Sequence, residues 1–580
     1  MGVWRSEMGY RIFFGACAGL FVMVTSQAAL STTIGYPAPV RARSGMVVTA
    51  SRYATQVGIQ VLREGGNAVD AAVAVGYALA VTDPCCGNLG GGGFLVYRPA
   101  HGQPWFLDFR EVAPRAATPS LYLNAQGEPV PGESLWSWKA IGVPGTVAGL
   151  EEARRLWGSW STARLLAPAI RLARRGFRLS PGQYRELVDD ARRLRADPSA
   201  MRVFFRKGQP RPAGSRIRQP ALAATLTRIA RGGARSFYQG EPAHAVVAAS
   251  RKNGGILSLA DFADYRPVVT RPLTCRFAGN RVITAPPPGG GATLCEMLNI
   301  LSGYPLGRDG FHRARSVHWI AEAMRWAYAD RNRFLGDPAF VRMPLRRLLS
   351  PRYAERIRDR IAPKRATPSS EVRPGIRMIR EGHDTTQYSI VDRAGNAVSV
   401  TYTLNTFFGT GLMAPGTGFF LNNEMDDFTT ALGHPNEYGL VQGRINAIAP
   451  GKRPLSSMTP TIVTQGHRVE IVTGSPGGST ITTTVLQILL NRLIYHLGAS
   501  ASVDAPRIHM QWLPDVLYYE PGALSARTRR RLARWGYHLK RGAPWGSLHW
   551  GDAESIFRSP LGLWEGVNDS RHPAGRAAGD

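Results

Sequence analysis

The sequence predicts an α+β protein, and three features support that fold class. The chain has 580 residues, of which 44% are hydrophobic, so it is long enough to bury a substantial core. Helical apolar spacing prevails before Thr385, most of all over residues 145–330. From Thr385 the pattern changes to alternating segments rich in β-branched residues. Thr385 is therefore the main boundary in the organisation of the chain.

The N-terminus carries the pattern of an export signal. Arg5 and Arg11 flank the start of an apolar run, residues 12–24, and small residues follow up to Ala28 and Ala29. A basic start, a short apolar run and an A-x-A-like site are typical of a signal peptide. We therefore expect residues 1–28 to be removed and the protein to be periplasmic or secreted. An uncleaved anchor is the alternative.

The charge is strongly positive and unevenly distributed. The net charge is +30, yet the part from Thr385 onward holds 17 basic and 14 acidic residues, so most of the excess precedes it. One dense basic stretch runs from Arg192 to Arg218. No nucleic-acid-reading module accompanies this stretch, so we interpret it as a solvated basic face and expect no nucleic acid as a partner.

Four cysteines lie outside the signal region: Cys85, Cys86, Cys275 and Cys295. There is no second Cys or His pair at metal-ligand spacing, so we expect no metal and no cofactor. Export would permit disulfides. The spacing does not select a pair, and buried thiols remain an equal alternative.

The elements before Thr385 follow a clear order. Residues 54–64 and 68–81 have helical spacing, and a strand is expected at 95–97. The motif GNLGGGGF, residues 87–94, lies between helix and strand. Phosphate loops run from strand to helix, so close backbone packing is favoured here over phosphate binding.

Later segments are assigned more coarsely. We expect a linker at 29–45, loops near 198–220, a strand pair near 267–285, and a rigid turn, APPPGGGAT, before a helix. Residues 363–382 are polar and predict an exposed segment suited to proteolysis.

Thr385 begins a predicted β-hairpin. Residues 393–395, Arg-Ala-Gly, form a three-residue loop with the glycine in its left-handed position. If Asp392 pairs with Asn396, Thr385 lies opposite Thr403, with the two side chains ~5 Å apart on one face. Asn405, two residues on, shares that face.

A threonine at this position suits nucleophilic catalysis. Its hydroxyl is a weak nucleophile, and cleavage after Asp384 would free an α-amine of pKa about 8 that can act as its base. Neighbouring motifs offer complementary groups. These are a serine pair for a carboxylate, a glycine pair for an oxyanion hole, and an acidic cluster for an ammonium group: Ser456 and Ser457, Gly477 and Gly478, and Glu424, Asp426 and Asp427.

The sequence resembles the γ-glutamyltranspeptidase family over nearly its whole length. Ten stretches carry the resemblance: GGNAVDAAVAVGYALAVTDP, GNLGGGGF, LDFREVAP, VPGTVAGLEEA, AEAMRWAYADRNRFLGDP, TTQYSIVD, TYTLNTFFGTG, NNEMDDF, KRPLSSMTPTIV and TGSPGGS. The resemblance implies an N-terminal nucleophile hydrolase with a four-layer αββα sandwich. It also implies one precursor that cuts itself into a large subunit, residues 29–384, and a small catalytic subunit, residues 385–580, which form a heterodimer.

The same resemblance implies a role for each matching residue. Thr385 attacks the γ-carbonyl of glutathione or another γ-glutamyl donor, and water or an amino acid or dipeptide acceptor receives the glutamyl group. Thr403 hydrogen-bonds the nucleophile, and Gly477 and Gly478 form the oxyanion hole. The donor's α-amino group is assigned to Asn405, Glu424 and Asp427, and its α-carboxylate to Arg110, Ser456 and Ser457. Tyr438 matches the tyrosine of a lid loop at about 433–444.

Gln387 is a departure from the family, because many members have His there. Two other functions remain open. A cephalosporin or glutaryl acylase of the same superfamily would share the nucleophile but not the amino-acid clamp. A non-catalytic basic binding protein would keep the scaffold without its chemistry, and the intact Thr385, Thr403 and glycine pair argue against it.

Overall fold

The computed structural model describes residues 35–372, 385–430 and 443–580. The chain divides into a short N-terminal unit, residues 1–36, and a large unit, Pro37–Asp580, which is described here by itself. The predicted signal peptide, the cleavage residue Asp384, and Tyr438 with most of its lid loop lie outside the described residues. None of the described helices has the length and apolar character that a membrane span requires.

Two seven-stranded antiparallel sheets form the centre of the described part of the large unit. The sheet that contains Thr385, called here the Thr385 sheet, has the order β21 (Arg576–Gly579), β2 (Met46–Thr49), β12 (Thr385–Val391), β13 (Ala397–Thr403), β3 (Gly92–Arg98), β4 (Trp105–Asp108), β9 (Val268–Thr270). The second sheet, called the facing sheet, has the order β1 (Val40–Ala42), β20 (Trp564–Val567), β19 (Ser555–Arg558), β15 (Arg468–Thr473), β14 (Thr461–Gln465), β11 (Asn280–Thr284), β10 (Leu273–Phe277).

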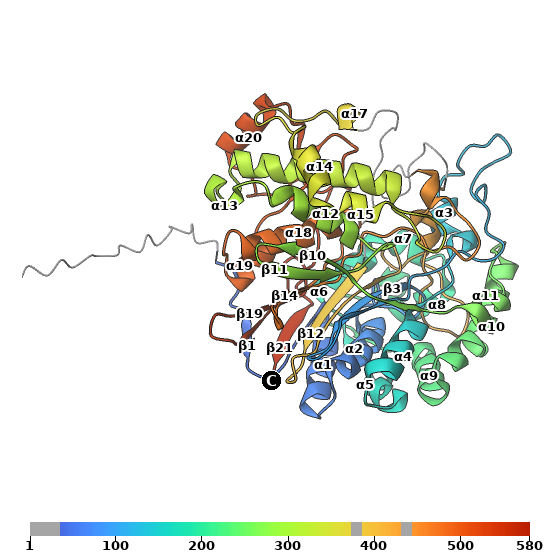
Figure 1. The fold of residues 1–580 in the computed structure, drawn as a ribbon. Coiled ribbons are helices and arrows are strands. Elements are labelled where there is room, and N and C mark those ends of the chain that lie inside the picture. Colours follow the sequence, from blue (N-terminus) through green and yellow to red (C-terminus); the bar gives the residue numbers. More distant parts are fainter. Residues whose placement is uncertain (1–34, 373–384, 431–442) are drawn as a thin grey trace, which may run out of the picture. The chain divides into compact units, whose positions relative to one another are not determined.

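Helices cover the outer face of each sheet (Figure 1). The layer on the Thr385 sheet contains α1 (Arg52–Arg63), α2 (Ala68–Thr82), α4 (Thr146–Trp157), α5 (Thr162–Arg175) and α9 (Pro220–Tyr238). The layer on the facing sheet contains α12 (Gly291–Leu301), α14 (Ala314–Phe334) and α18 (Thr480–Leu493). The other described helices of six or more residues are α6 (Pro181–Asp189), α8 (Pro198–Phe204), α10 (Glu241–Lys252), α11 (Leu259–Asp264), α16 (Pro351–Arg358), α19 (Ala499–Asp504) and α20 (Ala526–Arg534). A three-stranded sheet contains β16 (Ile508–His509), β17 (Leu517–Tyr519) and β18 (Leu539–Arg541), and the remaining described elements are shorter helices and two two-stranded sheets.

Three apolar cores identify the layers, because strand side chains alternate between faces. Tyr388 and Ile390 of β12 pack with the helices of their own sheet. Val391 of the same strand packs with Ile462 and Val472 of the facing sheet. On the far side of the facing sheet, a third core joins its strands to α12, α14 and α18. The order is therefore helices, sheet, sheet, helices, and the predicted αββα sandwich is confirmed.

The predicted hairpin register is also confirmed. β12 and β13 pair from Thr385 opposite Thr403 to Val391 opposite Ala397. The Asp392 N–H donates to the Asn396 carbonyl at 3.0 Å, which closes the loop. Gly395 in that loop has φ +88°, the left-handed conformation that glycine adopts without strain.

The glycine-rich motif packs against backbone. An added Cβ would overlap the Phe420 carbonyl at Gly90, the Thr403 carbonyl at Gly91 and the Thr401 carbonyl at Gly93. Because β3 pairs with β13, these glycines let the two strands and the loop after them approach closely. This agrees with the packing interpretation of the sequence.

Two elements were predicted wrongly, and one question left open is answered. The expected linker at 29–45 contains the strand β1, which pairs with β20. Residues 198–220 are not only loop, because Pro198–Phe204 form α8. Asp197 caps that helix by accepting from the backbone N–H groups of Ser199 and Ala200, each at 2.8 Å. Among the cysteines, Cys275 of β10 and Cys295 of α12 form a disulfide, with a Cα–Cα distance of 5.9 Å.

Gly93→Ala is expected to lower the free energy of unfolding by about 3 kcal/mol or more, since the new methyl group overlaps the Thr401 carbonyl and Tyr402. Gly182→Ala is the matched control. Its Cβ would meet only Ser180 Oγ, at 3.8 Å, within the described residues, and it lies in a helix, so little change is expected. Urea unfolding followed by circular dichroism measures both, and equal stability of the two variants would contradict the packing role.

Candidate active site

The predicted nucleophile lies at the first residue of a central strand. Thr385 is 8% exposed and begins β12, with its side chain between the two sheets. Its Oγ1 donates to Thr403 Oγ1 at 3.3 Å. Thr403 Oγ1 in turn accepts from the Asn405 N–H at 2.8 Å. Asn405 has φ +81°, an uncommon conformation for a non-glycine residue that turns the chain back beside Thr403.

A small pocket of about 30 Å³ opens onto Thr385 and contains most of the predicted site. The predicted residues in its lining are Arg110, Thr385, Thr403, Asn405, Glu424, Asp427, Ser456, Ser457 and Gly478. They come from the ends of β4, β12 and β13, the 3₁₀ helix η2 (Glu424–Asp427), the loop before β14, and the turn before α18. Segments far apart in the chain therefore meet at one hydroxyl group.

Arg110 is the electrostatic centre of this pocket. Its guanidinium is fully buried and forms ion pairs with Glu424 and Asp427, and Glu111 Oε2 lies 3.6 Å from Nη1. The backbone after β4 orients it, because Asp108 Oδ1 accepts from the Arg110 N–H at 2.8 Å. The groups predicted for the donor's carboxylate and for its ammonium thus lie side by side.

The carboxyl groups of this cluster have perturbed pKa values. Burial raises the pKa of Glu111 to about 7, even though the Arg110 charge opposes the shift. Burial likewise raises the pKa of Glu424 well above its ordinary range. For Arg110, burial alone would lower the pKa, but Glu424, Asp427 and Glu111 raise it overall. The raised pKa values mean that the cluster does not carry the full negative charge of its three carboxyl groups near neutral pH.

Sequence reasoning missed two charged residues of this site. Arg331 of α14 lines the pocket, is 2% exposed, and donates through Nη2 to Ser457 Oγ at 3.2 Å. Burial raises the pKa of Asp427 overall, and the charges of Arg110 and Arg331 oppose that rise. Glu111 stands next to Arg110 in the chain. Both residues lie inside stretches that carry the family resemblance, AEAMRWAYADRNRFLGDP and LDFREVAP. Their position in these stretches was the one sequence feature that could have identified them.

The glycine pair lies in the turn between β15 and α18. Gly477 has φ +125° and Gly478 φ +52°, conformations that suit glycine. Gly478 lines the pocket, whereas Gly477 is not part of its lining. Their roles as oxyanion-hole donors remain predictions.

Gln387 does share the face of Thr385, as the strand alternation predicts. Its amide is fully buried two residues further along β12, where Oε1 accepts from Thr401 Oγ1 at 2.5 Å. Nε2 donates to Ser399 Oγ at 3.1 Å. The amide therefore serves the interior of the sandwich and is not part of the pocket lining.

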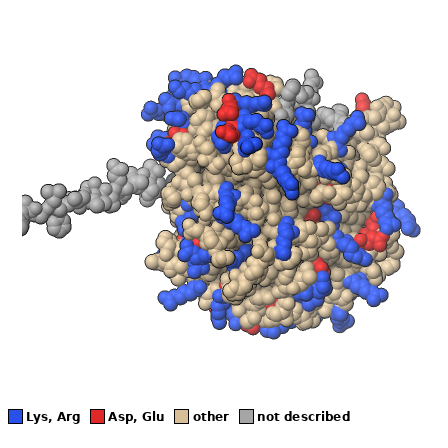
Figure 2. All heavy atoms as spheres, in the orientation of Figure 1, with Lys and Arg blue, Asp and Glu red and all other residues tan. Residues whose placement is uncertain are grey.

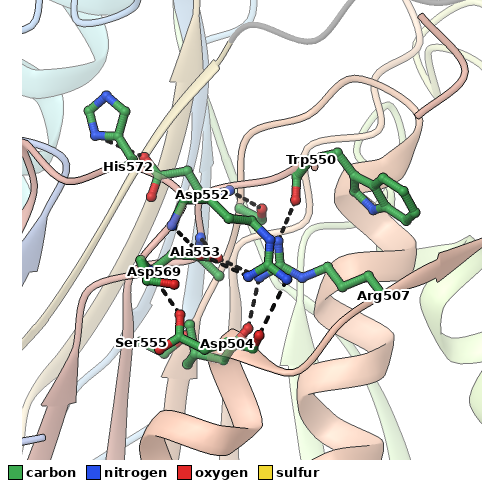
Figure 3. A network of polar contacts seen from close by, with 12 residues as sticks. Asp504, Arg507, Trp550, Asp552, Ala553, Ser555, Asp569 and His572 are labelled. Carbon is green, nitrogen blue, oxygen red and sulfur yellow. Dashed lines mark hydrogen bonds and ion pairs between the residues drawn. The ribbon is translucent and has the colours of Figure 1, made fainter. Parts of the chain in front are cut away.

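A second cavity, of about 630 Å³, reaches Thr385 from another side and is called here the rear cavity. Its lining includes Thr386, Cys85, Cys86, Asp552 and His572. The wall that carries Asp552 rests on the network in Figure 3, where Arg507 pairs with Asp569 and Asp569 accepts from the Ala553 N–H at 3.0 Å. His572 Nδ1 lies 3.3 Å from Asp552 Oδ2.

Basic side chains are spread over the face of the molecule seen in Figure 2. Figure 2 shows Lys and Arg distributed across the visible face, with smaller groups of Asp and Glu. This distribution agrees with a solvated basic surface on that face.

The fold and the site together define a class of protein. A threonine at the start of a strand, between two stacked antiparallel sheets covered by helices, is the arrangement of the N-terminal nucleophile hydrolases.

Comparison with known proteins narrows the class to a family. The model of the γ-glutamyltranspeptidase family matches residues 54–579. The chain is 48% identical over 552 residues to the glutathione hydrolase proenzyme of Pseudomonas sp. (strain A14), covering 93% of this chain and 95% of that protein. It is 44% identical over 539 residues to that of Escherichia coli (strain K12), covering 92% and 91%. The chain belongs to the γ-glutamyltranspeptidase family, and it is an enzyme.

The fold also extends to a related acylase. The crystal structure of cephalosporin acylase from Bacillus halodurans superposes with a TM-score of 0.83 at 28% identity, covering 95% of this chain and 99% of that one. The structural similarity keeps open the alternative of a cephalosporin or glutaryl acylase, because the two proteins share a fold.

Arg110→Leu is expected to destabilise the protein by about 3–5 kcal/mol near neutral pH, because it leaves buried carboxylates without their counter-charge. The sign follows from Glu111, whose pKa of about 7 in the folded protein exceeds its ordinary value of about 4.5. A carboxyl with such a raised pKa contributes stabilising free energy below about pH 4.5 and loses it as the pH rises to about 7. Protonated carboxyl groups need no counter-charge, so the stability lost in Arg110→Leu should become smaller on acidification.

Melting temperatures measured across that pH range test this expectation. Arg110→Lys is the matched control, since it keeps the charge but loses the forked geometry that reaches Glu424 and Asp427 together, and it should lose less stability than Arg110→Leu. A loss for Arg110→Leu that is equally large at every pH would mean that packing, rather than charge, is what Arg110 contributes.

Proposed function

We propose that this enzyme is a self-cleaving γ-glutamyltransferase and hydrolase. It cleaves the γ-glutamyl amide bond of glutathione and related compounds through a γ-glutamyl-threonyl ester on Thr385. The glutamyl group then passes to water or to an amino acid or dipeptide acceptor. The observation that carries the proposal is the pocket in which Thr385, hydrogen-bonded to Thr403, lies beside the Arg110 ion-pair cluster.

Maturation and catalysis use the same hydroxyl group. Thr385 Oγ1 attacks the Asp384 carbonyl, an N-to-O acyl shift gives an ester, and water hydrolyses it. The products are a large subunit, residues 29–384, and a small subunit, residues 385–580. The freed α-amine of Thr385 then accepts the hydroxyl proton when Oγ1 attacks a donor's γ-carbonyl. Backbone N–H groups of Gly477 and Gly478 stabilise the resulting oxyanion, and the amine leaves with a proton.

The ion-pair cluster suits the α-amino-acid end of a γ-glutamyl donor. Ammonium and carboxylate are attached to one carbon in the donor, so the groups that bind them must be neighbours. Glu424 and Asp427 with Asn405 take the ammonium, while Arg110 with Ser456 and Ser457 takes the carboxylate. A pocket of about 30 Å³ has no room for a glutamyl group. Donor binding therefore replaces the internal pairs of Arg110 with pairs to the donor.

The proposal also assigns roles to the rear cavity, the lid loop and the N-terminal segment. The rear cavity also reaches Thr385 and has room for the leaving amine or an acceptor. Tyr438, in the lid loop at about 433–444, covers the donor. We propose that residues 1–28 direct the chain to the periplasm or outside the cell and are then removed.

The alternative is an acylase like the structural neighbour described above. An acylase that takes glutaryl substrates has no α-ammonium group to bind, so it does not need buried Glu424 and Asp427 beside an arginine. Hydrolysis of glutaryl amides at a rate comparable to γ-glutamyl amides would favour this alternative.

Thr385→Ala is expected to remain a single chain, because it lacks the hydroxyl that attacks Asp384. The wild-type protein should yield a small subunit of about 21 kDa, scaled from 63.2 kDa for 580 residues, that begins at Thr385. Denaturing electrophoresis with N-terminal sequencing of each band is the measurement. Cleavage of Thr385→Ala at the same bond would refute self-cleavage.

Thr403→Val is expected to reduce kcat/KM for a γ-glutamyl anilide by roughly 10–100-fold, the effect of one lost hydrogen bond to a reacting group. Valine keeps the shape but accepts neither the Thr385 hydroxyl nor the Asn405 N–H. Thr401→Val is the matched control on the same strand and face, and its hydroxyl serves Gln387. Similar rates for the two variants would remove Thr403 from the mechanism.

The cleaved enzyme should show kcat/KM rising with pH as the α-amine of Thr385 loses its proton, with an ordinary pKa of about 8. The measurement is a pH–rate profile with a γ-glutamyl donor, extrapolated to zero acceptor, because acceptor amines titrate in the same range. Glu111→Gln is the control, since Glu111 has a pKa of about 7. A profile that is flat, or whose rise vanishes in Glu111→Gln, would assign the base elsewhere.

A further inference from the structure

The turn that follows α2 gathers three metal-binding side chains on the wall of the rear cavity. Asp83, Cys85 and Cys86 each offer one ligand atom, and these atoms lie within 4.8 Å of one another. Asp83 Oδ1 accepts from the Cys85 thiol at 3.5 Å. Backbone bonds fix the turn, because Asp83 O accepts from the Cys86 N–H at 3.2 Å and from the Gly87 N–H at 2.8 Å.

We infer that Asp83, Cys85 and Cys86 form a binding site for a thiophilic divalent cation of the zinc type. Two thiolates and one carboxylate are a donor set that zinc accepts, and the rear cavity leaves a fourth position for water. Zinc bonds of about 2.0–2.3 Å separate ligand atoms by ~3.3–3.8 Å, so shifts of about 1 Å complete the site. Each thiol gives up its proton to solvent as the metal binds.

The charges around this position are mixed: the protonated His572 opposes a cation, whereas a helix end and Glu186 attract one. The turn stands at the C-terminal end of α2, a fifteen-residue helix whose dipole is negative there. Glu186 adds a further negative charge close enough to raise the pKa of Asp83, although burial is the larger cause and His572 opposes it. Cys85 and Cys86 are 1% and 4% exposed, so neighbouring protein protects a bound ion.

A path to the site exists through the rear cavity. All three candidate ligands line that cavity, and so do exposed residues such as Arg185 and Asp189. An ion can therefore enter from solvent without unfolding of the turn. The inference departs from the sequence expectation of no metal, because a site of this kind needs only one turn and no second Cys or His pair.

A bound ion would lie in the same cavity as the proposed nucleophile, Thr385. Thr385 and Thr386 line the same cavity, and the Thr386 hydroxyl lies close enough to Asp83 to lower its pKa. The cavity is the proposed space for the leaving amine or acceptor. Occupancy should therefore inhibit the enzyme, and this second effect rests on the proposed function.

Titration of the purified enzyme with Cd²⁺ tests the site without using activity. Cadmium bound to thiolates absorbs in the ultraviolet. In the described part of the chain the other cysteines, Cys275 and Cys295, are joined, so this band reports on Cys85 and Cys86. We expect saturation at one ion per chain and loss of the band in Cys85→Ser and in Cys86→Ser.

The aspartate has a matched control. Asp83→Asn should weaken Cd²⁺ binding at least tenfold, whereas Asp189→Asn removes a charge from the same cavity without removing a ligand and should leave binding unchanged. Absence of a thiolate band in the wild-type enzyme would overturn the site. Equal weakening by both aspartate variants would also overturn it, since the cavity would then only attract cations.

Kinetics provide the second readout. Hydrolysis of a γ-glutamyl anilide should fall as the band saturates, recover with a chelator, and resist Cd²⁺ in Cys86→Ser. A saturating band without inhibition would keep the metal site and refute only its coupling to Thr385. If the serine variants do not fold, the stoichiometry of the wild-type band decides, because binding of more or less than one ion per chain contradicts a single three-residue site.

Discussion

The register of the β12–β13 hairpin is the constraint on which the rest of the site depends. It places Thr385 opposite Thr403 and leads directly into the turn at Asn405. β13 is held on its other side by β3, whose glycines allow the close pairing. A slip of one residue would turn Thr385 toward the helices and separate it from Arg110. Backbone hydrogen bonds, rather than side-chain contacts, therefore set the position of the reacting hydroxyl.

The two spaces that meet at Thr385 differ in a way that matches two kinds of task. The small pocket is charged, and Arg110 at its centre forms ion pairs with Glu424 and Asp427. The rear cavity is larger and bordered by side chains from distant segments, among them the wall supported by Arg507 and Asp569. In the proposed function, the small charged pocket selects an α-amino-acid group, whereas the larger rear cavity accommodates varied amines. The metal site that we infer lies in the second space, where occupancy obstructs exchange without disturbing recognition.

Local pattern predicted much of this structure, and most of its failures share one cause, which is contact between segments far apart in the chain. The hairpin register followed from the loop length alone, since antiparallel pairing fixes every later pair. Arg331 was missed because it lies on a helix of the far layer and reaches Ser457 only through the tertiary fold. The disulfide between Cys275 and Cys295 and the turn of Asp83 depended in the same way on how segments pack. Helix α8 was missed because its cap at Asp197 was not recognised.

Each of the two sheets contains strands from before and from after the proposed cleavage point. β1, β10 and β11 precede it and share a sheet with β14, β15, β19 and β20, while β12, β13 and β21 lie among β2, β3, β4 and β9. The precursor folds as one molecule, with every strand tethered at high effective concentration. After cleavage, reassembly of the same sheets is a reaction between two molecules. The stability of the mature enzyme would then be kinetic, because it would depend on a slow rate of unfolding. In dilute solution, its denaturation would be irreversible.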